Sequence, residues 1–302
     1  MRYAFVSAAL AASVSAHGLI TAIEGANGVV MPGLSVADGT PRDCSSNRCG
    51  SQADTAIIRN RELGTSEASA LGRTQGNGPI IAADMISAFM GTGSAPSNSG
   101  ASGATGEEDD ISGIKNAKQA RNDEHKRQIS ELFNGLFGGS RGGRNSGTES
   151  SFAAETMVAD MAGTGAQSGL PTASDNGQIQ MVYRQINQDG AGPLTADIDG
   201  TSGGTDPDAF QSAEVTQDVP GFGFQGLSLA TNTEFPVTVQ MPQGMTCDAT
   251  VAGVDNVCVV RVRNGAGAGP FGGSAAFTQT PAARKRAIAY RLKKRMQISR
   301  DD

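Results

Sequence analysis

Short apolar runs bounded by turn-forming residues constrain the fold more than any other feature of this chain. Residues 178–187 (QIQMVYRQIN) alternate apolar and polar side chains, and residues 235–241 (FPVTVQM) and 257–264 (VCVVRVRN) are rich in β-branched residues. Strands of this length and spacing predict a mainly β chain, folded as a single β-sandwich-like domain with a few helices. The clearest helix is expected over residues 79–91 (PIIAADMISAFMG), with proline in its first turn and glycine at its end.

A stretch of different composition, residues 92–147, interrupts the β pattern. It starts GTGSAPSNSGASGATGEEDD and ends near GGSRGGRNSG, and such Gly/Ser-rich flanks predict a disordered insertion that works as a flexible linker. Within it, residues 123–137 place apolar side chains at i, i+3, i+4, i+7 and i+8, which predicts an amphipathic helix. This helix could dock on the main domain, our preferred interpretation, or bind a membrane or a partner. Lys126 and Arg127 form a dibasic pair, typical of kexin-type processing sites.

The first sixteen residues have the pattern of a secretory signal peptide. One basic residue precedes the apolar run 3–12, and Val14 and Ala16 stand before the expected cut. No later stretch approaches the ~20 apolar residues of a membrane span. We therefore expect a secreted protein, extracellular or at the cell surface, whose mature chain begins at His17.

The expected organisation has five parts. Residues 1–16 are the signal peptide, 17–91 and 148–280 are the two portions of the β-rich domain, 92–147 are the linker, and 281–302 are a basic tail. The tail sequence PAARKRAIAYRLKKRMQ suits a solvated helix or tail, an acidic partner surface or proteolytic trimming, and we prefer the solvated end.

Four cysteines in an exported chain favour two disulfides. Three pairings are possible, and the local pairs Cys44–Cys49 and Cys247–Cys258 are the most economical of them. A zinc site is the competing interpretation, but it needs tightly paired spacing and more histidines than the two present.

Composition and charge exclude several functions. The formal net charge of −6 argues against a general nucleic-acid binder. The absence of tryptophan and the presence of only three tyrosines leave few aromatic platforms for stacking sugars. Asp189 and Asp199 could be paired carboxylates of a hydrolase, but aspartates between Gly and Thr are more typical of turns. Histidine is too rare for a Ser-His-Asp triad.

An N-terminal histidine offers copper both its amine and its imidazole, which are ligand types that suit this metal. His17 is therefore a candidate copper ligand. The other histidine, His125, lies in DEHKRQ beside the dibasic pair, and its simpler interpretation is a solvated side chain.

Long segments of the chain resemble one family of fungal proteins. They include HGLITAIEGANGVVMPGLSVADGTPRDC, SQADTAIIRNREL, LGRTQGNGPI, MTCDATVAG and AGPFGGSAAFTQ. These resemble the appressorium-associated secreted proteins of the Gas/Mas type, related to early-infection proteins of powdery mildew. The resemblance implies a virulence protein made by infection structures during host penetration. Because the chain also lacks a complete catalytic set, we expect it to contact fungal or plant cell-wall polysaccharide or a host surface component without catalysis.

The His17 start is also similar to that of lytic polysaccharide monooxygenases, copper enzymes built on β-sandwiches. The family resemblance leads us to expect a histidine in relatives where this chain has Arg184 in VYRQIN. Arg184 would then mark a lost copper ligand, because a guanidinium stays protonated. A copper-dependent oxidase is therefore the alternative to a non-catalytic surface protein.

Overall fold

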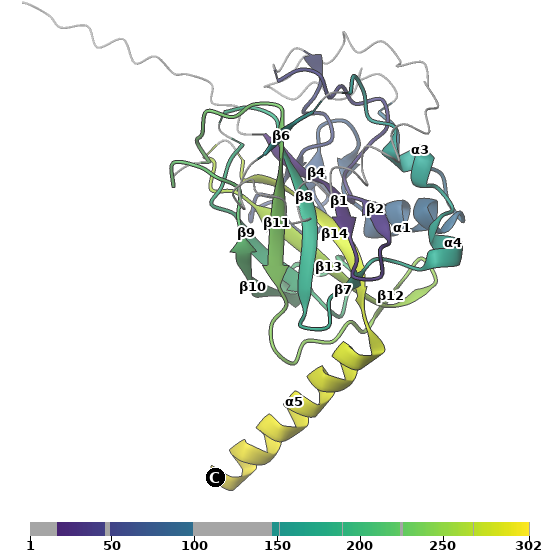
Figure 1. The fold of residues 1–302 in the computed structure, drawn as a ribbon, viewed down its shortest axis with the longest axis vertical. Coiled ribbons are helices and arrows are strands. Elements are labelled where there is room, and N and C mark those ends of the chain that lie inside the picture. Colours follow the sequence, from purple (N-terminus) through teal and green to yellow (C-terminus); the bar gives the residue numbers. More distant parts are fainter. Residues whose placement is uncertain are drawn as a thin grey trace, which may run out of the picture.

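The computed structural model describes residues 17–45, 49–98, 147–150, 152–188, 190–223, 226–267 and 269–301. Over these residues the chain is mainly β, with fourteen strands and four α-helices, which confirms the predicted fold class. Figure 1 shows β8 and β11 crossing in front of β13 and β14, with the shorter helices on one side and α5 extending away from the body.

The strands form two layers that share one strand. The first layer has the order β2-β1-β8-β11, and the second has the order β9-β13-β14-β3-β4-β5. Strand β10 (Phe210–Gln217) joins them, because its first half pairs with β9 and its second half with β11. All strand pairs of the described residues are antiparallel except β7 with β14. The other bounds are β1 (Gly18–Glu24), β2 (Val30–Pro32), β3 (Ala56–Ile57), β4 (Arg73–Thr74), β5 (Gly78–Pro79), β6 (Thr148–Glu149), β7 (Thr172–Ala173), β8 (Gln178–Gln185), β9 (Thr195–Asp199), β11 (Thr233–Gln240), β12 (Ala249–Val251), β13 (Val254–Arg263) and β14 (Phe271–Gln279).

The apolar core lies between the two layers. On β8, the alternating residues Ile179, Met181 and Tyr183 are all buried, as the period-2 pattern predicts. Strand β13 is buried on both faces from Val257 to Val262, and β9 and β14 pair with its two edges inside the second layer. Its run of consecutive apolar residues therefore belongs to a central strand rather than to a half-exposed one.

Small residues let β1 pass very close to β14. A Cβ added at Gly273 would lie 2.5 Å from the backbone nitrogen of Ile20. A side chain at this position would force the two layers apart, so Gly273 in PFGGSAAF has a packing role. This close crossing brings the start of β1 against the start of β14.

Three helices cover one side of the sandwich (Figure 1), namely α1 (Ala82–Met90), α3 (Met157–Met161) and α4 (Gly165–Ser168). Helix α1 ends at Gly91, whose φ of 76° is left-handed, as expected for a glycine cap. Its predicted start is wrong, because Pro79 belongs to β5 and the helix begins at Ala82. A short 3-10 turn, η2 (Pro207–Ala209), precedes β10.

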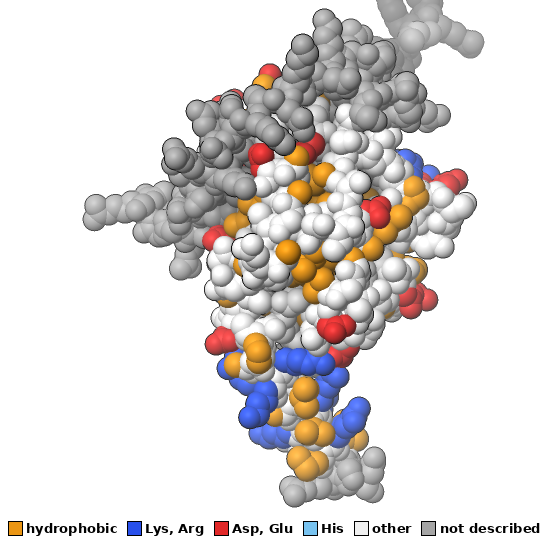
Figure 2. All heavy atoms as spheres, turned by 90° about the vertical axis from the view of Figure 1, so that its right-hand side faces the viewer, with side chains coloured by type: hydrophobic (Ala, Val, Ile, Leu, Met, Phe, Trp, Pro, Cys, Tyr) orange, Lys and Arg blue, Asp and Glu red, His pale blue; other side chains and the backbone are white. Residues whose placement is uncertain are grey.

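The basic tail is the helix α5 (Pro281–Asp301). Arg284 holds its first turn to the body through a 2.7 Å ion pair with Asp248, and Arg291 donates a 2.6 Å hydrogen bond to Thr246. From residue 288 to residue 298 its Lys, Arg and apolar side chains are exposed (Figure 2). Among the helices of the described ranges, none is both long and apolar enough to cross a membrane.

The structure joins Cys44 to Cys49 and Cys247 to Cys258. The first pair closes a five-residue separation before β3, and the second connects the segment just before β12 to β13. The predicted signal peptide (1–16) and most of the predicted insertion, including its helix, lie outside the described residues. Predictions about these segments stay predictions.

Candidate functional site

His17, the predicted first residue of the mature chain, is packed at the start of β1. Only 1% of the residue is exposed. Its backbone nitrogen donates a 2.7 Å hydrogen bond to Asn187 Oδ1, and its carbonyl accepts one from the backbone of Ile186 at 3.0 Å. The imidazole packs on the ring of Phe271, with 4.2 Å between ring centroids. The end of β8 and the start of β14 therefore fix both the backbone and the ring of His17.

A buried tyrosine lies beneath this corner. The hydroxyl of Tyr183 donates to the Gly190 carbonyl at 2.9 Å, and burial raises the pKa of the phenol well above its ordinary value. A Cβ at Gly190 would lie 2.0 Å from the His17 carbonyl oxygen, and one at Gly18 would lie 2.1 Å from the tyrosine hydroxyl. Two glycines therefore allow His17 and Tyr183 to pack at this spacing, and the tyrosine remains a neutral phenol.

Arg184, predicted to mark a lost copper ligand, is fully buried. In the pairing of β1 with β8, Arg184 lies opposite Leu19, two residues along β1 from His17. Its guanidinium donates to Ser150 Oγ, the Arg42 carbonyl and Asn232 Oδ1. Burial, reinforced by the nearby charge of a second arginine, lowers its pKa to about 10. Arg184 thus links β8 to three segments that are distant from it in the sequence.

That second arginine, Arg42, is the centre of a buried ionic cluster. Its guanidinium donates to both oxygens of Asp54, at 3.0 and 2.5 Å, and through Nε to Glu155 at 3.0 Å. Burial alone would lower the pKa of Arg42, but the two carboxylates outweigh it and raise the pKa. Glu155 also accepts the backbone N–H of Thr156 and of Met157 at the start of α3. The cluster therefore holds the chain around residue 42 to the segment that leads into α3.

Glu234 completes this region on β11. It lies 3.7 Å from Arg184 and accepts a 3.2 Å hydrogen bond from Ser150. Burial raises its pKa, and the attraction of Arg184 offsets this only in part. The carboxyl group is thus less readily ionised than an ordinary glutamate.

The aspartates considered for hydrolysis have structural roles where the structure describes them. Asp199 accepts hydrogen bonds from the backbone N–H of Thr201, Ser202 and Gly204. Burial opposes its ionisation, but these hydrogen bonds prevail and lower its pKa, which suits turn stabilisation and not a general acid. Asp189 lies outside the described residues.

Metal ligation by side chains of the described ranges is limited. Over those residues, no three His, Cys, Asp or Glu side chains lie together as a ligand set. His125, Lys126 and Arg127 fall outside the described residues, so their predicted roles stay predictions.

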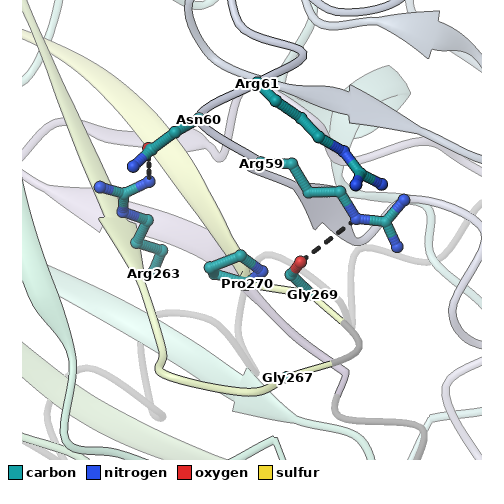
Figure 3. Close-up of a pocket in the computed structure, with 7 residues that line it drawn as sticks. All are labelled: Arg59, Asn60, Arg61, Arg263, Gly267, Gly269 and Pro270. Atoms are coloured by element: carbon teal, nitrogen blue, oxygen red, sulfur yellow. Dashed lines mark hydrogen bonds between the residues drawn. The ribbon is translucent and has the colours of Figure 1, made fainter.

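Sequence reasoning missed an arginine-lined hollow on the surface. Its volume is about 650 Å³. Figure 3 shows Arg59 and Arg61 on one side of it and Arg263 on the other, with the side chain of Asn60 facing Arg263. The remaining lining residues are Gly267, Gly269 and Pro270. The available signal was basic residues directly after or within buried strands, in AIIRNREL and VCVVRVRN.

One carboxylate, Glu62, lies behind the hollow. It pairs with Arg59 at 3.2 Å and with Arg73 at 3.1 Å, while Arg61 is 3.8 Å away. Burial tends to raise the pKa of Glu62, but hydrogen bonds from Arg59 and Arg73 outweigh it and lower the pKa. Glu62 therefore stays ionised and offsets only part of the positive charge at the hollow.

The fold and its sites define a disulfide-bonded, β-sandwich-like protein with a buried ionic cluster and a basic surface hollow. The chain belongs to the Egh16-like virulence factor family, whose pattern matches residues 15–272. It is 53% identical over 290 residues to the appressoria-specific virulence factor GAS2 of Pyricularia oryzae, covering 96% of this chain and 92% of that protein. It is 38% identical over 172 residues to the appressoria-specific virulence factor GAS1 of the same fungus, covering 56% of this chain and 66% of that protein. No solved structure matches the chain.

These relatives confirm the family resemblance and support a virulence role in infection structures. The two disulfides are consistent with an exported protein, since such bonds persist in oxidising compartments.

Proposed function

We propose that this protein is secreted by fungal infection structures and promotes host penetration by binding a wall polysaccharide or host surface component without catalysis. The proposal that the protein acts without catalysis rests on the hydrogen bonds made by Arg184. This residue lies near His17 in the ladder, yet its guanidinium is committed to Ser150, Asn232 and the Arg42 carbonyl. A committed, protonated guanidinium gives no lone pair to a metal.

The test is complementation of a strain that lacks the gene. A His17→Ala variant is expected to restore penetration by infection structures to the level given by the unaltered gene, because the proposal needs no metal ligand at this position. Secretion and thermal stability of the variant are measured in parallel. A variant that is secreted and folded but fails to restore penetration would contradict the non-catalytic proposal.

A second candidate function is copper-dependent oxidation of a wall polysaccharide. The observation that favours it is the position of His17, at the start of β1 beside Asn187 and close to buried Tyr183. When bound, copper would supply the redox chemistry, and this chain would contribute the imidazole and, after processing, the terminal amine of His17.

Copper titration with electron paramagnetic resonance separates the two proposals, once the mature chain is shown to begin at His17. A tight one-to-one site with several nitrogen ligands, lost in His17→Ala, would favour the oxidase. Oxidised oligosaccharides released from chitin or glucan with copper and a reductant would establish it. Weak or absent binding supports the non-catalytic function.

A further inference from the structure

The arginine-lined hollow carries hydrogen-bond donors that the described part of the protein does not use. Arg61 has a side chain that is 80% exposed, and 3.8 Å to the nearest oxygen of Glu62 is too long for a hydrogen bond. Arg263 uses only Nη1, which donates to the Ile58 carbonyl and to Asn60 Oδ1. Its Nε and Nη2 have no partner among the described residues. Each guanidinium is thus able to donate a hydrogen bond to a further oxygen atom of a ligand.

Hydrogen bonds hold the described backbone segments that line the hollow. Arg59 Nε donates to the Gly269 carbonyl at 3.2 Å, and the Ile58 N–H donates to the Pro270 carbonyl at 2.8 Å. Asn264 Oδ1 accepts backbone N–H groups at both ends of the loop, from Ala266 and Phe271. A site whose frame is already ordered loses less conformational freedom on binding.

The charge and width of the hollow indicate the kind of ligand. Three guanidiniums line it on a chain whose formal net charge is −6, and none of its described lining residues is acidic. Planar guanidiniums bind carboxylates through paired hydrogen bonds. Arg61 and Arg263 stand on opposite sides (Figure 3), an arrangement that suits a chain with repeated carboxylates, one for each guanidinium.

We propose that this hollow binds an acidic polysaccharide through the carboxylates of successive uronate residues. The proposal rests on the proposed surface function and names its ligand class. A volume of about 650 Å³ is in the range of sites that hold ligands the size of a short oligosaccharide. No aromatic ring is among the described lining residues, so stacking would not hold a neutral sugar here. Charge pairing with arginine is the interaction that remains for a saccharide.

The experiment is isothermal titration of the full mature chain with tetragalacturonate. Matched probes are its fully methyl-esterified form, a neutral chitin tetrasaccharide, and inorganic phosphate alone. Tetragalacturonate is expected to bind at low salt, and esterification is expected to weaken binding at least ~10-fold by removing the charged hydrogen bonds. Equal binding of the ester would overturn the proposal, as would phosphate binding as tight as that of the uronate.

Two double variants remove equal charge from different surfaces. Arg61→Gln with Arg263→Gln changes the hollow, and Lys293→Gln with Lys294→Gln changes exposed residues of α5. The first is expected to weaken tetragalacturonate binding at least ~10-fold and the second less than ~2-fold. Arg61→Gln alone, at an exposed position, is the safeguard if the first double variant does not fold. Equal losses in the two double variants would show that net charge alone attracts the ligand, which would overturn the proposal.

The outcome is separable from that of the proposed function. Absent uronate binding together with full rescue of penetration by His17→Ala would refute this ligand and leave the non-catalytic function intact. Tight uronate binding together with failed rescue by His17→Ala would refute the non-catalytic function and leave the ligand site intact.

Discussion

Two groups of arginines in this protein have opposite environments. Arg42 is fully buried, and each of its nitrogens donates to a carboxylate oxygen of Asp54 or Glu155. Arg61 is mostly exposed and makes no hydrogen bond within the described chain, while Arg263 uses one of its three nitrogens. An arginine that stabilises the fold therefore differs from one that is available to a ligand in how many of its guanidinium N–H groups already donate hydrogen bonds within the protein.

The difference has an electrostatic cause. A guanidinium removed from water is tolerated only when carboxylates and hydrogen bonds replace its solvation. Around Arg42 two carboxylates do so, and its pKa rises, whereas the pKa of neighbouring Arg184 falls because its compensation is weaker. At the surface hollow, the side chain of Arg61 is 80% exposed, so water can solvate it and no internal partner is required. A ligand can therefore displace water there without breaking the fold.

The largest expected effect comes from removing the buried arginine. Arg42→Met would leave the carboxylates of Asp54 and Glu155 buried without a cation, and such losses cost about 3–5 kcal/mol. Urea denaturation is expected to show a fall of that order in the free energy of unfolding. The matched control is Arg286→Met on α5, whose arginine is 58% exposed, with a change under ~0.5 kcal/mol. Similar small losses in both variants would contradict the role assigned to the cluster.

A smaller effect, on the pH dependence of the free energy of unfolding, is expected at Asp38, which is close to the buried ionic cluster. Asp38 accepts the backbone N–H of Val158 and Ala159 at the start of α3, at 2.9 and 2.7 Å. Burial, aided by the charges of Glu155 and Asp160, outweighs these hydrogen bonds and raises its pKa to about 7. An unfolded aspartate releases its proton near pH 4. Between these values the folded chain holds more protons than the unfolded chain, so Asp38 makes the free energy of unfolding fall as pH rises.

Urea denaturation at pH 4.5, 6 and 7.5 measures this effect. Asp38→Asn is expected to remove part of the fall in stability between pH 4.5 and 7.5, because the amide does not titrate. The comparison uses the difference between the two proteins at each pH, so that titration common to both cancels. A difference independent of pH would show that Asp38 ionises alike in the folded and unfolded chain.

Local pattern predicted the strands well, because alternation and β-branched runs depend on neighbours in the sequence. Residues 178–187 and 257–264 gave β8 and β13, and Gly91 ended α1 as expected. Pro79 was misplaced because proline suits the first turn of a helix as well as a short strand, and here it pairs with Arg73 in a short hairpin. The glycine at 273 gave no hint of the close crossing with β1, which depends on a strand more than 200 residues away.

The candidate sites were harder to predict, since they depend on contacts across the chain. Arg184 was singled out for a possible lost ligand, but its partners Ser150 and Asn232 come from other segments. Nor does the sequence show that Arg61 and Arg263 lie across one hollow, because they meet only when β14 pairs with both β3 and β13. The sequence shows that these residues are positively charged, but only the strand topology shows that they lie together on one surface.

An intermediate effect is expected at the arginine that belongs to both environments. Arg59 lines the hollow and also donates to Gly269 and pairs with Glu62. Arg59→Gln is expected to lower the free energy of unfolding by about 1 kcal/mol, the size of a typical hydrogen-bond loss in a partly exposed site. Urea denaturation measures the change, with Lys285→Gln on α5 as the control. A loss in the free energy of unfolding as large as that of Arg42→Met would show that Arg59 mainly stabilises the fold, as Arg42 does.

The smallest expected change in stability is at Arg61. Its ion pair with Glu62 is long and exposed, and such pairs contribute little. Arg61→Gln is expected to change the free energy of unfolding by less than ~0.5 kcal/mol in the same urea titration. A loss above ~1 kcal/mol would mean that its donors already serve the fold, and the distinction between the two groups of arginines would fail at this residue. A neutral result in stability, combined with weaker uronate binding, is the pattern that a ligand-binding arginine requires.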